Sequence, residues 1–158
     1  MRVHLGGDHA AYDLLGELIT FLEAEGHEPV NHGPFAFDAL DDYPVFVLRA
    51  AQAVAAEPDS LGIVLGGSGN GEQIAANKVV GIRAALAYNE ELARLARQHN
   101  DAQVLSIGAR MNTVAEAKAM VAAFLATPFS HDERHQRRID MMSAYQADGS
   151  LPPLPEPD

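Results

Sequence analysis

The sequence predicts an α/β fold of the Rossmann-like type. Its three layers are α/β/α, and the middle layer is a mainly parallel five-stranded sheet. Short apolar stretches alternate with amphipathic helical patterns along the chain, as expected for a parallel sheet covered on both faces. The clearest apolar stretch, residues 61–65, leads into a glycine-rich loop and then into a helical segment. A chain of 158 residues also fits one domain with a substantial core.

Each predicted element has its own local signal. Leu14, Leu18 and Leu22 form one stripe of a helix that ends at Gly26, a residue that tolerates a left-handed C-cap. Asp41-Asp42-Tyr43-Pro44 gives the next helix an acidic N-cap and a proline near its first turn. The predicted strands are 2–5, 28–31, 61–65, 83–87 and 103–107, and the later helices are 72–78, 90–99, 113–126 and 131–147.

We expect one domain over residues 1–150, followed by a proline-rich tail over residues 151–158 that cannot be helical and lies on the surface. No apolar run is long enough to span a membrane, and the N-terminus lacks the pattern of a signal peptide. The chain has no cysteine, which excludes disulfides, thiolate metal sites and cysteine nucleophiles. These features favour a cytoplasmic protein that does not bind a membrane.

The charge of the chain limits its partners. A formal net charge of -11 argues against nucleic-acid binding, because a phosphate backbone would repel such a surface. Three of the nine arginines fall within residues 134–138. This cluster is large enough to hold one phosphate group and too small for a duplex.

The loop Gly66-Gly67-Ser68-Gly69-Asn70-Gly71 predicts an anion site. Its four glycines cost conformational entropy, and they provide a concave row of backbone N–H groups before a helix. The loop lacks the Gly-Lys-Ser/Thr of a P-loop and the spacing of the dinucleotide motif. The anion is therefore not expected to be a nucleotide phosphate.

Glu72 follows this loop directly, and two interpretations of it are open. The structural one is a favourable contact between a carboxylate and the start of a helix. The catalytic one is enolisation, in which a base removes the proton next to a carbonyl while N–H donors stabilise the enediolate oxygen. A helix start alone lowers the carboxyl pKa, so an efficient base at this position also requires desolvation by bound substrate.

Further candidates follow the first and last strands, because ligands of open α/β sheets bind at the carboxyl ends of the strands. Asp8 and His9 follow the first strand and Arg110 follows the last. Asp8 also suits a helix cap, with His9 as a partly exposed loop residue. His99 ends a helix, where it is either a dipole partner or an acid-base residue.

The last helix carries His131, Arg134, His135 and Arg138 three and four residues apart, and therefore on one face. On an acidic chain this stripe suits a phosphate clamp, and the alternative is a solvated face with ion pairs inside the helix. The two histidines have the spacing of paired metal ligands, but the adjacent arginine repels a cation and the zincin order is missing. We therefore expect no metal site here.

Seven motifs occur in an order that resembles the ribose-5-phosphate isomerase B family and its relatives acting on six-carbon sugar phosphates. The resemblance extends from Val3 to Tyr145. The motifs are Gly7-Asp8-His9, Asp42-Tyr43-Pro44, Gly67-Ser68-Gly69-Asn70-Gly71, Ala75-Ala76-Asn77-Lys78, Arg97-Gln98-His99-Asn100, Gly108-Ala109-Arg110 and Arg134-His135-Gln136-Arg137-Arg138.

The resemblance implies a Rossmann-like homodimer, or a tetramer, whose active sites combine residues of two chains. It implies interconversion of ribose 5-phosphate and ribulose 5-phosphate, a step of the pentose phosphate pathway, with neither metal nor organic cofactor. Asp8 and His9 would contact the sugar, His99 would assist ring opening, and Asn100 would bind a hydroxyl. The loop residues Gly67, Ser68, Gly69, Asn70 and Gly71 would hold the enediolate oxygens, Arg110, Arg134 and Arg138 the phosphate, and Tyr43 and His135 would line the site.

Many members of this family place the base on a cysteine where this chain has Gly66, so the chain resembles the branch that uses a glutamate, here Glu72. Three other functions remain open. The chain could isomerise another sugar phosphate, such as allose 6-phosphate or a tetrose phosphate. It could be a sugar-phosphate sensor without catalysis, or a nucleotide-binding module of the flavodoxin or universal-stress type.

Overall fold

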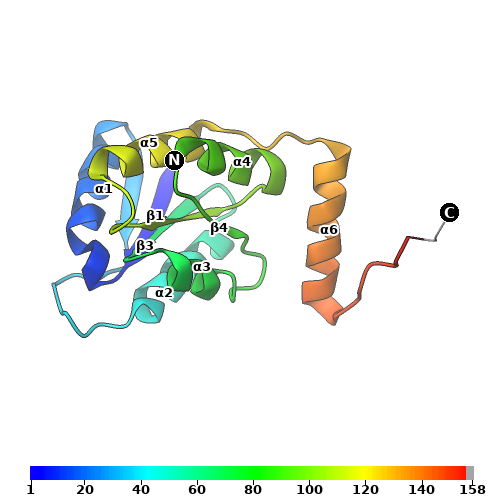
Figure 1. The fold of residues 1–158 in the computed structure, drawn as a ribbon, viewed down its shortest axis with the longest axis horizontal. Coiled ribbons are helices and arrows are strands. Elements are labelled where there is room, and N and C mark those ends of the chain that lie inside the picture. Colours follow the sequence, from blue (N-terminus) through cyan, green and yellow to red (C-terminus); the bar gives the residue numbers. More distant parts are fainter. Residues whose placement is uncertain (156–158) are drawn as a thin grey trace.

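The computed structural model describes residues 1–155, and its centre is a five-stranded sheet in the order β2-β1-β3-β5-β4. All four pairings of neighbouring strands are parallel. The predicted α/β fold with a mainly parallel sheet is therefore confirmed (Figure 1). The strands are β1 (Arg2–Gly7), β2 (Glu28–Asn31), β3 (Leu61–Gly66), β4 (Ala84–Leu86) and β5 (Val104–Gly108).

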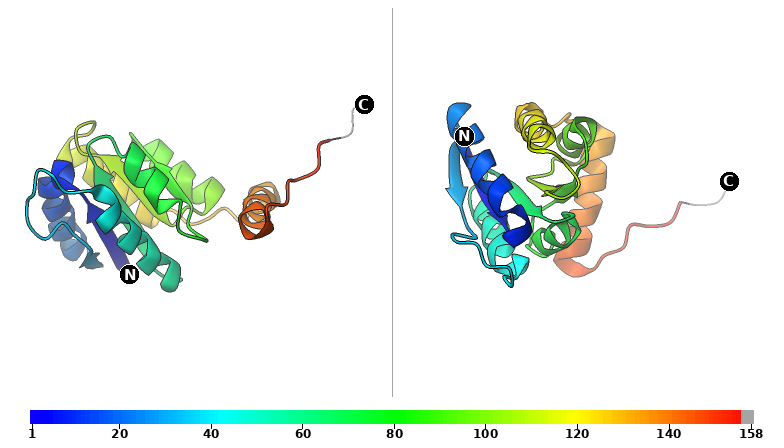
Figure 2. Two further views of the ribbon diagram at one scale, coloured as in Figure 1. Left: turned by 90° about the horizontal axis from the view of Figure 1, so that it is seen from below. Right: turned by 60° about the vertical axis from the view of Figure 1, so that its left-hand side comes forward.

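Helices cover both faces of the sheet, and each face has its own apolar cluster. One cluster joins the sheet to α1, α4 and α5, and the other joins it to α2 and α3 (Figures 1 and 2). The helical elements are the 3-10 turn η1 (His9–Ala11), α1 (Tyr12–Ala24), α2 (Tyr43–Ala56), α3 (Asn70–Ala76), α4 (Glu90–Asn100), α5 (Val114–Ala126) and α6 (Glu133–Asp148).

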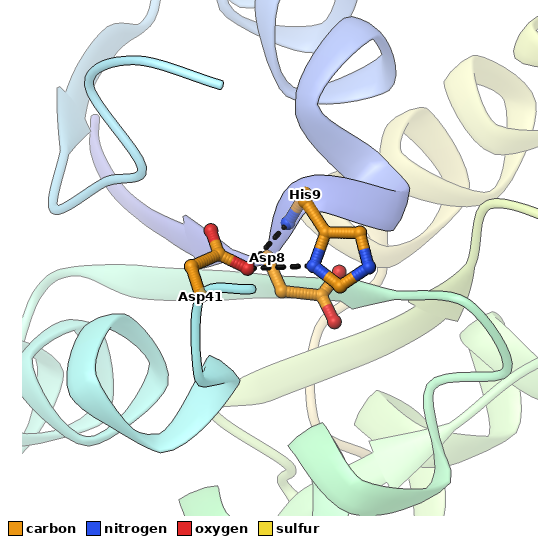
Figure 3. Close-up of side chains that lie close together, drawn as sticks. All are labelled: Asp8, His9 and Asp41. Atoms are coloured by element: carbon orange, nitrogen blue, oxygen red, sulfur yellow. Dashed lines mark hydrogen bonds and ion pairs between the residues drawn. The ribbon is translucent and has the colours of Figure 1, made fainter. Parts of the chain in front are cut away.

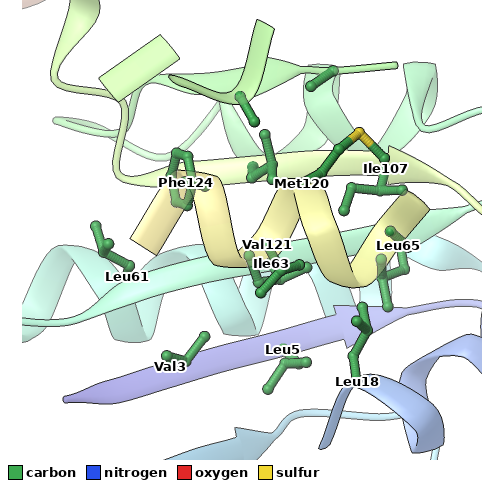
Figure 4. Packing of buried hydrophobic residues seen from close by; sticks show 14 of the residues in the cluster. Val3, Leu5, Leu18, Leu61, Ile63, Leu65, Ile107, Met120, Val121 and Phe124 are labelled. Atoms are coloured by element: carbon green, nitrogen blue, oxygen red, sulfur yellow. The ribbon is translucent and has the colours of Figure 1, made fainter. Parts of the chain in front are cut away.

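The strand β3 shows how the sequence supplies both faces at once. All six of its residues are buried. Ile63 and Leu65 pack into the first cluster, together with Leu5 of β1 and Phe124 of α5 (Figure 4), whereas Val64 packs into the second. This alternation follows from the two-residue period of a strand and requires an apolar residue at every position of a strand covered on both sides.

The helix α6 lies to one side of the layered body (Figures 1 and 2). Its buried residues are His135 and Ile139. It is attached near the end of α4, where the His99 and His135 rings lie 4.3 Å apart and the Ser130 N–H donates to the Gln98 carbonyl. Most of the surface of α6 is therefore exposed in a single chain.

Some boundaries differ from the predicted ones. The helix after the glycine loop begins at Asn70, because Gly69 adopts a left-handed conformation (φ 82°) at the N-cap. Gly26 has the expected left-handed conformation after α1. Residues 151–155 are exposed and form neither helix nor strand, and the rest of the predicted tail lies outside the described residues. None of the helices within residues 1–155 has the length and apolarity to cross a membrane.

The buried His4 of β1 contacts the half-buried His32 after β2, and through Glu57 it also contacts the end of α2. The Nδ1 of His4 lies 3.0 Å from the Nε2 of His32, and the Nε2 of His4 lies 3.3 Å from a Glu57 carboxylate oxygen. Glu57 also pairs with Arg2. Burial, followed by the charge of His4, lowers the pKa of His32, so the folded chain disfavours the protonated ring.

This shift predicts how stability depends on pH. Because the unfolded chain binds the His32 proton more readily, the free energy of unfolding should fall as the pH decreases through about 6.5. His32→Gln keeps a nitrogen near the Nε2 position without a titratable ring, so its stability should fall less over the same range. Urea unfolding of both proteins between pH 7.5 and 5.5 measures the difference. Equal slopes would mean that His32 does not contribute.

Candidate active site

The strands β1, β3 and β5 all end in glycine at the same edge of the sheet, and hydrogen bonds join the loops that follow β3 and β5. The Ala109 N–H donates to the Gly66 carbonyl at 2.7 Å, and the Arg110 N–H donates to the Gly67 carbonyl at 3.0 Å. A Cβ atom at Gly108 would lie 2.6 Å from the Ser68 carbonyl oxygen. This position therefore requires glycine, and the two loops form one surface.

The glycine loop is held in its shape by contacts with β5 and β4 that no local sequence pattern predicts. The Ser106 hydroxyl of β5 donates to the Gly69 carbonyl at 2.7 Å, in a fully buried position. A Cβ at Gly69 would lie 2.7 Å from the Leu86 side chain. Ser106 is the one polar residue in the apolar strand Val104–Gly108. A single polar residue in a buried strand indicates that its side chain makes a specific hydrogen bond.

The loop presents hydrogen-bond donors. Within the described part of the chain, no group accepts a hydrogen bond from the backbone N–H of Gly67, Ser68 or Gly69. The next N–H, that of Asn70, donates to the Ser68 hydroxyl at 3.3 Å. Three neighbouring donors at the edge of a buried sheet can bind an oxyanion.

Glu72 lies in the first turn of α3 and is 4% exposed. Burial is the main cause that raises the pKa of its carboxyl group, and the charge of Asp8 raises it further. The position at the start of a helix would have the opposite effect, so desolvation by the protein itself outweighs it. A carboxyl group whose pKa is raised is a stronger base than an ordinary carboxylate, which suits a group that accepts and returns a proton.

The space for this carboxylate exists because residue 66 is glycine. A Cβ at Gly66 would overlap the carboxyl group of Glu72. The carboxylate therefore occupies the volume that a side chain at the end of β3 would fill.

Asp8, His9 and Asp41 meet beside this loop (Figure 3). An Asp8 carboxylate oxygen accepts from the Ala10 N–H at 3.0 Å, so Asp8 caps the 3-10 turn η1, whereas the N-cap of the predicted helix, α1, is Ala11. Asp41 accepts hydrogen bonds from His9, although the sequence had suggested only an acidic cap for α2. The N-cap position of α2 is Asp42, and its side chain makes no capping bond.

Two further candidates border the same loop. A Cβ atom at Gly71 would lie 2.7 Å from the Tyr43 hydroxyl oxygen, so the Tyr43 ring lies directly against the glycine loop. The side chain of Arg110 approaches the corresponding position at Gly67 within 3.4 Å. Arg110 is exposed, and no carboxylate within residues 1–155 forms an ion pair with it. The cation is available to an anionic ligand.

The remaining candidates lie at the opposite edge of the sheet. His99 and Asn100 end α4, which returns to the start of β5, and the Asn100 carbonyl accepts from Arg83 just before β4. His135 is 5% exposed and pairs with the Ser130 hydroxyl, and burial lowers its pKa. Arg134 and Arg138 are exposed on α6, with Arg134 3.3 Å from an Asp132 oxygen. One chain therefore does not bring these residues to Glu72.

A family model described as ribose/galactose isomerase matches residues 3–142. The chain belongs to this family. It is 58% identical over 155 residues to a Mycolicibacterium paratuberculosis protein named ribose-5-phosphate isomerase B, with 98% of each chain covered. It is 57% identical to the protein of that name in Mycobacterium tuberculosis strain H37Rv, covering 98% of this chain and 96% of the relative.

Solved structures agree with this assignment. The chain resembles ribose-5-phosphate isomerase B from Mycoplasma genitalium with bound ribulose-5-phosphate, at a TM-score of 0.90 and 39% identity. That match covers 93% of this chain and 97% of the other. The type B ribose 5-phosphate isomerase of Trypanosoma cruzi matches with a TM-score of 0.89 and 40% identity, covering 94% and 98%.

The environment of Glu72 predicts the effect of Asp8. Asp8→Asn should lower the pKa of Glu72, because it removes a nearby negative charge and Asn still accepts from the Ala10 N–H. Carbon-13 NMR of the glutamate carboxyl groups measures this pKa. Asp13→Asn removes the same formal charge from an exposed position of α1 and is the control. If Asp8→Asn left the Glu72 pKa unchanged, burial alone would raise it.

Proposed function

We propose that this chain interconverts ribose 5-phosphate and ribulose 5-phosphate, with Glu72 as the acid and base. The observation that carries the proposal is a desolvated carboxyl group of raised pKa beside a loop with free N–H donors. The family and the relatives named ribose-5-phosphate isomerase B support the same reaction. The ligand named for the Mycoplasma genitalium structure, ribulose-5-phosphate, is one of the two sugar phosphates of this reaction.

In the proposed reaction the Glu72 carboxylate removes the proton from C2 of the open-chain aldose. The electron pair of the C2–H bond forms the C1–C2 double bond, and O1 becomes an oxyanion that the N–H groups of Gly67, Ser68 and Gly69 stabilise. A proton moves from O2 to O1, and the protonated Glu72 returns its proton to C1. The product is the ketose, and no electron leaves the substrate.

Gly66 is part of this proposal. The Glu72 carboxylate fills the space that a side chain at position 66 would need. A base at either position would therefore act from nearly the same volume, which supports the assignment of this chain to the branch with a glutamate base.

We propose that a second copy of the chain supplies the residues that bind the phosphate and the residues that open the sugar ring. Within one chain His99, Asn100, Arg134 and Arg138 lie at the edge of the sheet away from Glu72. A homodimer, alone or within a tetramer, would place the exposed arginines of one α6 near the glycine loop of the other copy, where Arg110 adds a third cation. We place this metal-free reaction in the cytoplasm.

The substrate length is tested by a panel. The EDTA-treated protein is assayed with ribose 5-phosphate, allose 6-phosphate and erythrose 4-phosphate. We expect the highest kcat/KM for ribose 5-phosphate. A preference for another member would keep the mechanism and change the substrate. No turnover of any of them would favour a sugar-phosphate sensor.

Removing the base should abolish turnover while the fold remains. Glu72→Gln keeps the size of the side chain and should lower kcat about 10²-fold to 10⁴-fold, the range expected for a general base. The control is Glu23→Gln, on the exposed surface of α1. Coupled-enzyme kinetics with circular dichroism separates chemistry from folding. Near wild-type kcat in a folded Glu72→Gln protein would contradict the mechanism.

Removing a phosphate contact should act on binding. Arg134→Ala should raise KM for ribose 5-phosphate about 10-fold to 100-fold, because a charged hydrogen bond is worth roughly 1.5–3 kcal/mol. Arg137 is also exposed on α6 and is not among the proposed ligands, so Arg137→Ala is the matched control. An unchanged KM in Arg134→Ala would remove this residue from the phosphate site.

A further inference from the structure

Asp41 holds His9 through a single oxygen atom. The Oδ1 of Asp41 accepts from the backbone N–H of His9 at 3.0 Å and lies 2.7 Å from the Nδ1 of its ring (Figure 3). The two residues come from separate segments, His9 from the 3-10 turn η1 after β1 and Asp41 from the loop before α2. This contact therefore fixes the His9 ring relative to the loop that precedes α2.

The burial of Asp41 makes these bonds important. Its side chain is 8% exposed, and its Oδ2 is buried without a hydrogen-bond partner among residues 1–155. Removing a carboxylate from water is costly unless hydrogen bonds compensate. The backbone and ring N–H groups of His9 are the donors that compensate the burial of the Asp41 carboxylate. Hydrogen bonds to a charged acceptor are stronger than those to a neutral one.

The contact also decides where the ring proton resides. An ionised carboxylate only accepts hydrogen bonds, so the Nδ1 of His9 must carry the hydrogen. The Nε2 on the far side of the ring is then the nitrogen that can meet a ligand, and no residue in the described chain pairs with it. The edge-to-face contact with Phe37, with ring centres 6.4 Å apart, restrains the ring further.

We infer that Asp41 is a positioning residue, which fixes the tautomer and orientation of His9 so that Nε2 faces the sugar phosphate. The inference rests on the proposed function, in which His9 contacts the substrate. A carboxylate behind the imidazole that contacts a ligand is a general way to orient such a ring. Asp41 acts through His9 and does not itself touch the substrate.

A divalent cation is the competing use of this cluster, because ligand atoms of Asp8, His9 and Asp41 lie within 4.8 Å of one another. Two observations favour the hydrogen bond. The Nδ1 of His9 lies 2.7 Å from the Oδ1 of Asp41, a hydrogen-bonding distance, and a ring nitrogen that carries a hydrogen has no free lone pair for a metal. Figure 3 also shows the other oxygen of Asp41 pointing away from His9 and Asp8.

The experiment combines nitrogen-15 NMR of the histidine rings with steady-state kinetics. In the wild-type protein His9 should be protonated at Nδ1, and in Asp41→Ala this preference should be lost. KM for ribose 5-phosphate should rise about 10-fold or more, comparable to the loss found when the carboxylate behind a metal-binding histidine is removed. Asp41→Asn keeps an acceptor oxygen and should restore most of the lost affinity.

A double-mutant cycle separates positioning from stability. His9→Gln retains a nitrogen near Nε2 and removes Nδ1, so adding Asp41→Ala to it should leave KM unchanged. Asp42→Asn changes the same charge at the neighbouring exposed residue and is the control. An unchanged His9 tautomer, an unchanged KM in Asp41→Ala, or the same rise in KM in the His9→Gln background would overturn the inference. So would loss of the Nδ1 hydrogen when Zn²⁺ is added at an equimolar amount.

The NMR measurement needs no substrate. If the wild-type protein does not turn over ribose 5-phosphate, the proposed function fails, while the tautomer still reports on the contact between Asp41 and His9. The two failures are therefore distinguishable.

Discussion

The parallel winding of the sheet separates the residues of this protein into two groups. In a β-α unit the strand ends at one edge of the sheet and the following helix ends at the other. The loops after β1, β3 and β5 therefore meet and bring Asp8, the glycine loop and Arg110 together. By the same geometry the end of α4 carries His99 to the opposite edge, and α6 begins beside it.

Close packing at the first edge then sets the chemistry. The glycines at positions 66, 69 and 108 leave no room for side chains, and the loop packs against β5 and Ser106. The absence of a side chain at Gly66 leaves room for the Glu72 carboxylate at the end of β3, where it is removed from water. The raised pKa of Glu72 and the free N–H groups beside it thus have one structural origin, the absence of side chains around the loop.

The sequence was sufficient for the fold and for the location of the glycine loop, because both depend on local patterns. The continuous apolar run of β3 and the alternation of strands and helices carried that information. The sequence did not predict the partner of Asp41, since an aspartate before a helix also suits a cap and the contact with His9 joins residues 32 positions apart. The burial of Glu72 was equally hidden, because desolvation depends on how separate strands pack around it.

The proposal that each active site combines residues of two copies is tested most directly by mixing subunits. Glu72→Gln protein and Arg134→Ala/Arg138→Ala protein, each nearly inactive at low substrate, are unfolded together, refolded as a mixture and assayed. If each site combines the carboxylate of one chain with the arginines of the other, half of the dimers are hybrids with one intact site, and activity should recover to about a quarter of wild type. A mixture no more active than its two parents would show that each chain builds its site alone and would contradict the account.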